Sequence, residues 1–100
     1  MEIEWDEAKR RHNLDKHGVD FAHALEFAWE DALVIVDDRF AYGEERRIAL
    51  GLFRGRVHVV VHTVRENVTR MISFRRANAR ERRTYEKNEG KVSRYRQWRS

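Results

Sequence analysis

Two short turn signals divide the middle of the chain into strands of alternating polarity. Arg54–Gly55 and Glu66–Asn67 each separate two runs in which apolar and polar residues alternate, a pattern typical of antiparallel hairpins. Taking each pair as a two-residue turn fixes the register, because positions that face each other across a hairpin have numbers with a constant sum. The segment from Arg47 to Arg75 is therefore expected to form a three-stranded antiparallel sheet.

This register predicts one apolar and one polar face. Arg47 is expected to face His62 across the first hairpin, and His62 to face Met71 across the second. The face expected to be dry carries Ile48, Leu50, Leu52, Val57, Val59, Val61, Ile72 and Phe74, with Val61 opposite Ile72 and Val59 opposite Phe74. The face expected to be open carries His58, His62, Ser73 and Arg75 beside Val60 and Met71, with His58 opposite Arg75 and with Ala49 and Gly51 leaving a shallow groove.

Capping signals predict two helices before the sheet. Asp6 and Gly18 bound a polar helix over Glu7–His17. Asp20 is expected to cap a second helix, which covers the dry face. The apolar positions of this second helix recur at helical spacing and are Phe21, Ala24, Leu25 and Ala28.

A strand and a helix complete the predicted elements. Ala32–Val36 reads as a first strand and is followed by a polar loop. A third helix over Ala79–Glu89 begins with a capping box of Asn78 and Glu81, and its only large apolar side chain is Tyr85.

These elements predict an α+β protein with two N-terminal helices, a four-stranded, mainly antiparallel sheet and a C-terminal helix. A chain of 100 residues leaves no room for a second core, so residues 1–90 are expected to form a single domain. Residues 91–100 form a basic tail in which cations alternate with apolar residues, and we expect this tail to be disordered.

Composition narrows the classes of function. The absence of cysteine excludes disulfides and thiolate zinc sites, and no histidine pair has the spacing and carboxylate of a metal site, so no metal and no cofactor are expected. No apolar run is long enough to span a membrane, and the N-terminal segment lacks the apolar centre of a signal peptide. A cytoplasmic protein that does not bind a membrane is expected.

The charges divide between the two halves of the chain. Residues 1–50 hold 7 Lys and Arg against 13 Asp and Glu, whereas residues 51–100 hold 14 against 4. The halves either neutralise each other in the fold, or the basic half faces a polyanion. The dominance of arginine in the second half favours the polyanion, because the guanidinium group binds phosphate through two hydrogen bonds.

Four motifs, in order and at similar spacing, resemble the BrnT family of bacterial type II toxins: EWDEAKRRHNLDKHGVDF, GEERRIALG, VVHTVRE and ISFRRANARERRTYE. The resemblance covers about residues 2–89. It implies a fold similar to RelE-type ribonucleases and cleavage of RNA that arrests translation. It also implies neutralisation by a BrnA-like antitoxin, whose ribbon-helix-helix domain binds operator DNA within a hetero-oligomer of toxin and antitoxin.

Metal-independent RNA cleavage needs proton transfer and a cation that stabilises the dianionic phosphate. Histidine suits the first task and arginine the second, so His62 is a candidate base or acid and Arg75 a candidate phosphate clamp. Together with the resemblance, this gives a predicted catalytic set of His62, Arg65, Ser73, Arg75 and Tyr85. The predicted RNA-binding set is Arg46, Arg47, Arg70, Arg76, Arg80, Arg82 and Arg83.

Structural interpretations stay open for several of these residues. His62 is alternatively a half-buried strand histidine, Arg65 a turn residue bonded to Glu66, and Tyr85 the anchor of the last helix. The protein as a whole is alternatively a non-catalytic module that binds nucleic acid or antitoxin and acts in operon repression. A small-molecule enzyme is disfavoured, because the sequence has no glycine-rich phosphate loop and no nucleophile motif.

Overall fold

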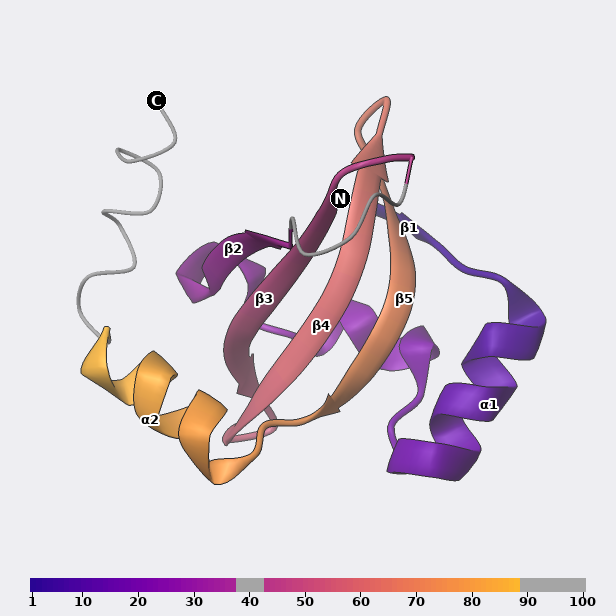
Figure 1. Ribbon diagram of the computed structural model, residues 1–100. Helices are drawn as coiled ribbons and strands as arrows, with labels where there is room; N and C mark the ends of the chain where they lie inside the picture. The colour runs from indigo at the N-terminus through magenta and orange to yellow at the C-terminus, as the bar shows by residue number, and fades with distance from the viewer. Residues whose placement is uncertain (38–42, 89–100) are drawn as a thin grey trace.

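A five-stranded sheet with strand order β1-β5-β4-β3-β2 forms the centre of the computed structural model, which describes residues 1–37 and 43–88 (Figure 1). The elements are β1 (Glu2–Glu4), α1 (Glu7–His17), the 3₁₀ helices η1 (Phe21–Glu26) and η2 (Trp29–Asp31), β2 (Leu33–Asp37), β3 (Arg46–Phe53), β4 (Arg56–Arg65), β5 (Val68–Arg76) and α2 (Ala79–Lys87). The α+β class is confirmed, but the sheet is mixed and has a fifth strand, because β1 pairs in parallel with β5.

Helix α1 has the predicted bounds and caps. The Asp6 side chain accepts hydrogen bonds from the backbone nitrogens of Ala8 and Lys9, and Gly18 takes the left-handed conformation with φ of 72°. Helix α1 is polar, and it is held beside β5 by the buried side chain of Asn13, which bonds the backbone of Phe74. No helix in the described ranges is long and apolar enough to span a membrane.

The second predicted helix is instead the 3₁₀ helix η1, and the predicted role of Leu25 is wrong. Asp20 is the cap, as expected, because its side chain accepts a hydrogen bond from the Ala22 nitrogen at 2.9 Å. Phe21, Ala24 and Phe27 are buried, whereas Leu25 is 69% exposed. A three-residue spacing of buried positions matches the three residues per turn of a 3₁₀ helix.

The hairpin of β3 and β4 has the predicted register. Arg54 and Gly55 both have positive φ, 51° and 79°, as a two-residue turn with this twist requires. Arg47 faces His62, and Leu52 faces Val57.

The hairpin of β4 and β5 follows the prediction only as far as its middle. Its turn is Glu66–Asn67 and His62 faces Met71, but a β-bulge follows, and Val61 faces Ser73. The bulge adds one residue to β5 and shifts the pairing of all later residues by one position. The predicted pairs in that part are wrong, namely Val61 with Ile72, Val59 with Phe74 and His58 with Arg75.

On β3 and β4 the predicted dry and open faces are exchanged, although the register between these strands is as predicted. The main core lies on the face predicted to be open, where Val60, Met71 and Phe74 pack against η1. The small residues predicted to form a groove instead admit an aromatic ring, since a Cβ at Gly51 would lie 2.7 Å from the Phe27 ring. A second, smaller cluster on the opposite face joins Leu50, Val59 and Tyr85.

Helix α2 covers the end of this second face (Figure 1). The predicted capping box is present, with Asn78 accepting from the Glu81 nitrogen and Glu81 accepting from the Asn78 nitrogen. The helix ends at Lys87, with Asn88 as its C-cap. The predicted tail and residues 38–42 of the predicted loop lie outside the described residues.

Candidate nucleic-acid interface

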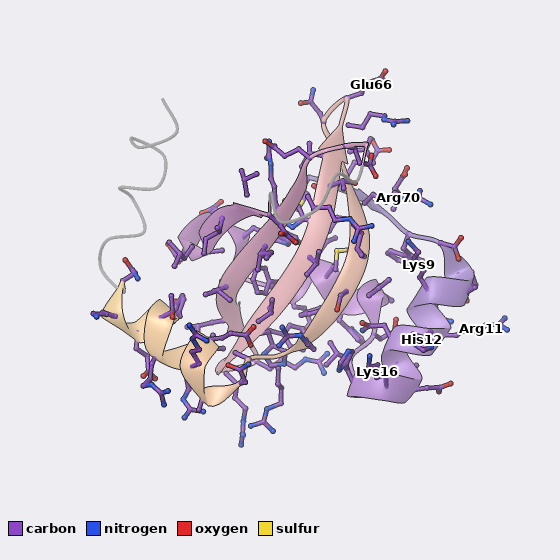
Figure 2. All side chains as sticks on the ribbon, in the orientation of Figure 1. Lys9, Arg11, His12, Lys16, Glu66 and Arg70 are labelled. Atoms are coloured by element: carbon purple, nitrogen blue, oxygen red, sulfur yellow. The ribbon has the colours of Figure 1, made fainter. Side chains whose placement is uncertain are left out.

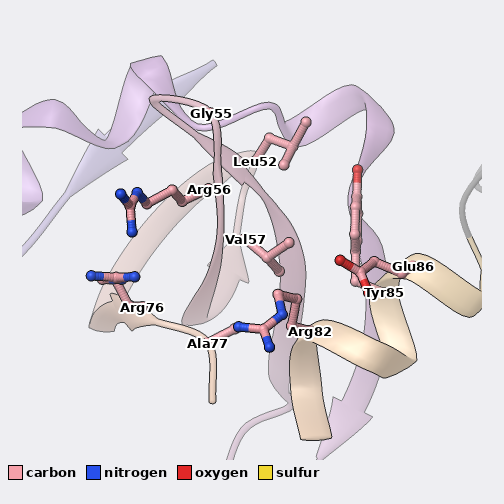
Figure 3. Close-up of a pocket in the computed structure, with 9 residues that line it drawn as sticks. All are labelled: Leu52, Gly55, Arg56, Val57, Arg76, Ala77, Arg82, Tyr85 and Glu86. Atoms are coloured by element: carbon pink, nitrogen blue, oxygen red, sulfur yellow. The ribbon is translucent and has the colours of Figure 1, made fainter. Parts of the chain in front are cut away.

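A pocket of about 270 Å³ opens where the turn between β3 and β4, the end of β5 and the inner side of α2 meet (Figure 3). Three separate segments supply its wall, so the pocket exists only because α2 folds back over the end of the sheet. Its lining residues are Leu52, Gly55, Arg56, Val57, Arg76, Ala77, Arg82, Tyr85 and Glu86.

Three arginines from different elements dominate the pocket. Arg56 begins β4, Arg76 ends β5 and Arg82 lies in the middle of α2. In Figure 3 the guanidinium groups of Arg56 and Arg76 lie near each other on the side away from Tyr85 and Glu86, while Arg82 extends from α2 toward Ala77. Within residues 1–37 and 43–88, no carboxylate lies at ion-pair distance from these three guanidinium groups. Their donors are therefore available to an anion.

Tyr85 and Glu86 form the opposite side of the pocket (Figure 3). The Tyr85 ring packs with Leu50 and Val59 and is 5% exposed, so its predicted role as the anchor of α2 is confirmed. Glu86 is exposed and is the only acidic residue among the described residues that line the pocket. The pocket thus combines a cationic side with a side that carries a phenol and a carboxylate.

Arg75 fixes α2 to the sheet. Its Nη1 and Nη2 donate to Oε1 and Oε2 of Glu81, both at 2.8 Å. This paired contact lowers the pKa of Glu81, and burial opposes that effect. Because Glu81 also accepts from the Asn78 nitrogen, Arg75 holds the first turn of α2 in place, and with it Arg82, which directly follows Glu81.

The two strand histidines lie in the core and not on an open face. His62 is 4% exposed and His58 is 5% exposed. Burial lowers the pKa of His62 to about 4, and the charge of Arg47 adds to the effect. Burial also lowers the pKa of His58. Both rings are therefore neutral at pH 7, and the predicted groove shared by His62 and Arg75 is wrong, because the two residues lie on opposite faces.

The remaining predicted residues are spread over the fold. Arg65 and Arg70 lie at the other end of the sheet, and each forms an ion pair there. Arg65 Nη2 is 3.7 Å from Glu44 Oε2, and Arg70 Nη1 is 2.7 Å from Glu4 Oε2. Ser73 shares the face of Arg75, since it pairs with Val61. Arg47 Nε donates a hydrogen bond to Glu45 Oε2 at 2.8 Å, and Arg46 lies opposite Asp37 in the pairing of β3 with β2. Arg80 and Arg83 are exposed on α2. The structure brings together Arg76, Arg82 and Tyr85 of the predicted sets.

Sequence reasoning missed Arg56 and Glu86. A signal for Arg56 was present, because the first residue after the Arg54–Gly55 turn must lie at the same end of the sheet as Arg76. Glu86 gave no such signal, since its place depends on how α2 packs. No group of three or more His, Asp or Glu side chains with metal-binding geometry occurs in the part of the chain that the structure describes.

Comparison with known proteins identifies the family of this chain. Residues 5–81 match a family model described as the ribonuclease toxin, BrnT, of type II toxin-antitoxin systems. A search of curated proteins gave no match. The matched segment runs from the residue before the α1 cap to the first turn of α2 and includes Arg56 and Arg76. Because the match spans well over half of the chain, the protein belongs to the BrnT family of ribonuclease toxins of type II toxin-antitoxin systems.

Proposed function

We propose that this protein is a metal-independent endoribonuclease toxin that cleaves RNA at the pocket under α2 and so arrests translation. Membership of the family supports an RNA substrate and an antitoxin partner. The observation that supports the location is that Arg56, Arg76 and Arg82, from three elements, line one pocket and have no carboxylate partner in the described chain. All three side chains are exposed, and their positive charges attract an anionic substrate.

The pocket supplies the groups that cleavage through the ribose 2′-hydroxyl requires. The 2′-oxygen forms a bond to phosphorus, the bond from phosphorus to the 5′-oxygen breaks, and the products are a 2′,3′-cyclic phosphate and a 5′-hydroxyl. In this proposal Arg56, Arg76 and Arg82 bind the phosphate oxygens and stabilise the added negative charge. Glu86 accepts the proton of the 2′-hydroxyl, and the Tyr85 hydroxyl donates a proton to the leaving 5′-oxygen.

Arg75 acts in this site as a positioning residue. Its two hydrogen bonds to Glu81 hold the first turn of α2, and Arg82 and Tyr85 follow on the same helix. The sequence-based hypothesis that His62 transfers protons remains a hypothesis, and it requires the core to open, because the ring is 4% exposed. Tyr85 is as buried as His62 but, unlike His62, it lines the pocket, and Glu86 and the three arginines of the pocket are exposed.

The antitoxin is proposed to be a BrnA-like protein that covers the arginine pocket. A partner that places carboxylates on Arg56, Arg76 and Arg82 neutralises the charges that bind RNA, so the complex is expected to be inactive. Binding to operator DNA then belongs to the antitoxin within the hetero-oligomer.

The test is RNA cleavage by the purified protein in EDTA, with analysis of the product ends. The parent is expected to leave 2′,3′-cyclic phosphates, and Arg76→Ala and Arg82→Ala are each expected to lower the cleavage rate about 100-fold, as for loss of a donor to a transition-state anion. Arg11→Ala is the matched control, because Arg11 is 74% exposed on α1, away from the pocket. Binding of RNA without any cleavage, with or without ribosomes, would instead support a non-catalytic module.

A further inference from the structure

A second group of basic side chains, one lysine and two histidines, lies on the last turns of α1, outside the pocket. His12 and Lys16 are exposed and one helical turn apart, so their side chains share one side of the helix. Figure 2 shows them along α1, with Lys9 and Arg11 nearer the start of the helix. His17, the last residue of α1, is half-buried. Asp15 lies in the same turn, but no ion pair joins it to these cations in the described chain.

The sheet edge holds this part of α1 next to Arg75. Strand β1 pairs with β5 only as far as Arg70, so the edge of β5 is open to α1 beyond that point. There the Asn13 side chain donates to the Phe74 oxygen at 2.7 Å and accepts from the Phe74 nitrogen at 3.1 Å. Because His17 follows Asn13 by one helical turn, it lies near the residue that follows Phe74, which is Arg75.

The electrostatics agree with this placement. The pKa of His17 is lowered first by burial and then by the positive charges of Lys16, Arg75 and His12. Positive charges from α1 and from β5 therefore both act on the His17 ring. Arg75, which is paired with Glu81, is followed directly by Arg76, which lines the arginine pocket, so basic residues lie between α1 and the pocket at the end of β5.

We propose that His12, Lys16 and His17 form a second phosphate-binding site, which continues the path of single-stranded RNA from the arginine pocket over the end of β5 onto α1. This inference rests on the proposed function and adds to it a substrate several nucleotides long. The pocket contacts the phosphate at the cleaved bond, and on α1 the charge of Lys16 and the ring N–H groups of the two histidines contact a neighbouring phosphate. Such contacts are electrostatic and independent of base sequence.

The test is fluorescence anisotropy with 2′-O-methyl oligoribonucleotides of 3 and 12 nucleotides, which lack the attacking hydroxyl and are not cleaved. Lys16→Glu is compared with Lys9→Glu, a matched reversal on the same helix. Lys9 is exposed, has no ion pair among the described residues and lies about 10 Å farther from the end of α1. Lys16→Glu should weaken binding of the 12-mer about tenfold. The slope of the logarithm of the binding constant against the logarithm of the salt concentration should become shallower by about one, as expected for the loss of one phosphate contact. Binding of the 3-mer should be unchanged.

Other outcomes separate the two proposals. Equal binding of the 12-mer by Lys16→Glu and Lys9→Glu overturns the α1 site, while loss of both probes in Arg76→Ala leaves the pocket supported. If the parent protein binds neither probe, the proposed function fails, and the α1 site fails with it. Circular dichroism of each variant shows whether the fold is intact, and Lys16→Ala repeats the comparison if the reversal disturbs α1.

Discussion

Trp29 and His62 meet edge to face in the core, with ring centroids 5.1 Å apart and ring planes at 86°. The second strand histidine has the same kind of surroundings, since the His58 ring lies 5.0 Å from Phe53 and 5.8 Å from Phe74. Both histidines therefore fill positions that an aromatic residue fills in other cores. Their first contribution is to packing.

Replacing His62 separates packing from chemistry. His62→Ala should lower the free energy of unfolding by about 3 kcal/mol, because it leaves a cavity beside Trp29. His62→Phe should keep the fold and the RNA cleavage rate, as measured by urea unfolding and a cleavage assay. A folded His62→Phe variant that no longer cleaves RNA would instead show that His62 takes part in the reaction.

Acid should weaken the fold through the same ring. The pKa of His62 is about 4 in the folded protein and near 6.5 when unfolded, so the unfolded chain takes up the proton first. The free energy of unfolding should be constant with respect to this group above pH 6.5. It should then fall by about 1.4 kcal/mol per pH unit down to about pH 4. His58 adds a change in the same direction.

Urea midpoints measured between pH 7.5 and pH 4.5 check this dependence. His62→Phe removes the titrating group and should flatten the curve, while the contribution of His58 remains. An unchanged slope in His62→Phe would mean that other groups cause the loss of stability in acid.

Asn13 should be needed for the attachment of α1. Its side chain donates to the Val19 and Phe74 oxygens and accepts from the Phe74 nitrogen. Asn13→Ala leaves these buried backbone groups without partners and should cost about 3 kcal/mol in unfolding free energy. Faster hydrogen exchange at the Phe74 amide checks the cause. Asn13→Asp keeps the oxygen that accepts from the Phe74 nitrogen but loses the two donated hydrogen bonds. It should therefore restore slow hydrogen exchange at the Phe74 amide without restoring the full stability.

The contact of Arg75 with Glu81 should affect cleavage more than stability. Arg75→Lys keeps the charge but loses the paired hydrogen bonds, so α2 and its Arg82 should be less well placed. We expect about a tenfold lower cleavage rate constant and, because the pair is partly exposed, a change of at most about 1 kcal/mol in stability. The measurement is single-turnover cleavage together with thermal unfolding. A variant that cleaves at the parent rate would exclude this positioning role.

Local signals predicted the parts of the fold that local physics controls. The bounds of α1 follow from Asp6 and Gly18, and the first hairpin follows from the turn at Arg54–Gly55. Strand β1 was missed because three residues are too short for an alternation to be visible. The 3₁₀ geometry of η1 was missed because Phe21 and Ala24 also fit an α-helix.

The faces and the site could not be predicted from local signals. Neither glycine nor proline marks the bulge in β5, so nothing in the sequence shows that the register changes. The aliphatic face resembled the core more than the face with two histidines did, and the choice between them depended on the aromatic rings of Phe27 and Trp29 packing from outside the sheet. The pocket depended on the position of α2.

The bulge in β5 acts as a half-period phase shift in the alternation of the strand. Up to Met71 the strand follows the phase set at the turn, and from Ser73 onward it follows the opposite phase. An uninterrupted strand would place Phe74 beneath α2 and Arg75 among the core aromatics. A single added residue therefore decides that the ring enters the core and the guanidinium reaches Glu81, so the basic end of the sheet depends on one irregularity in its backbone.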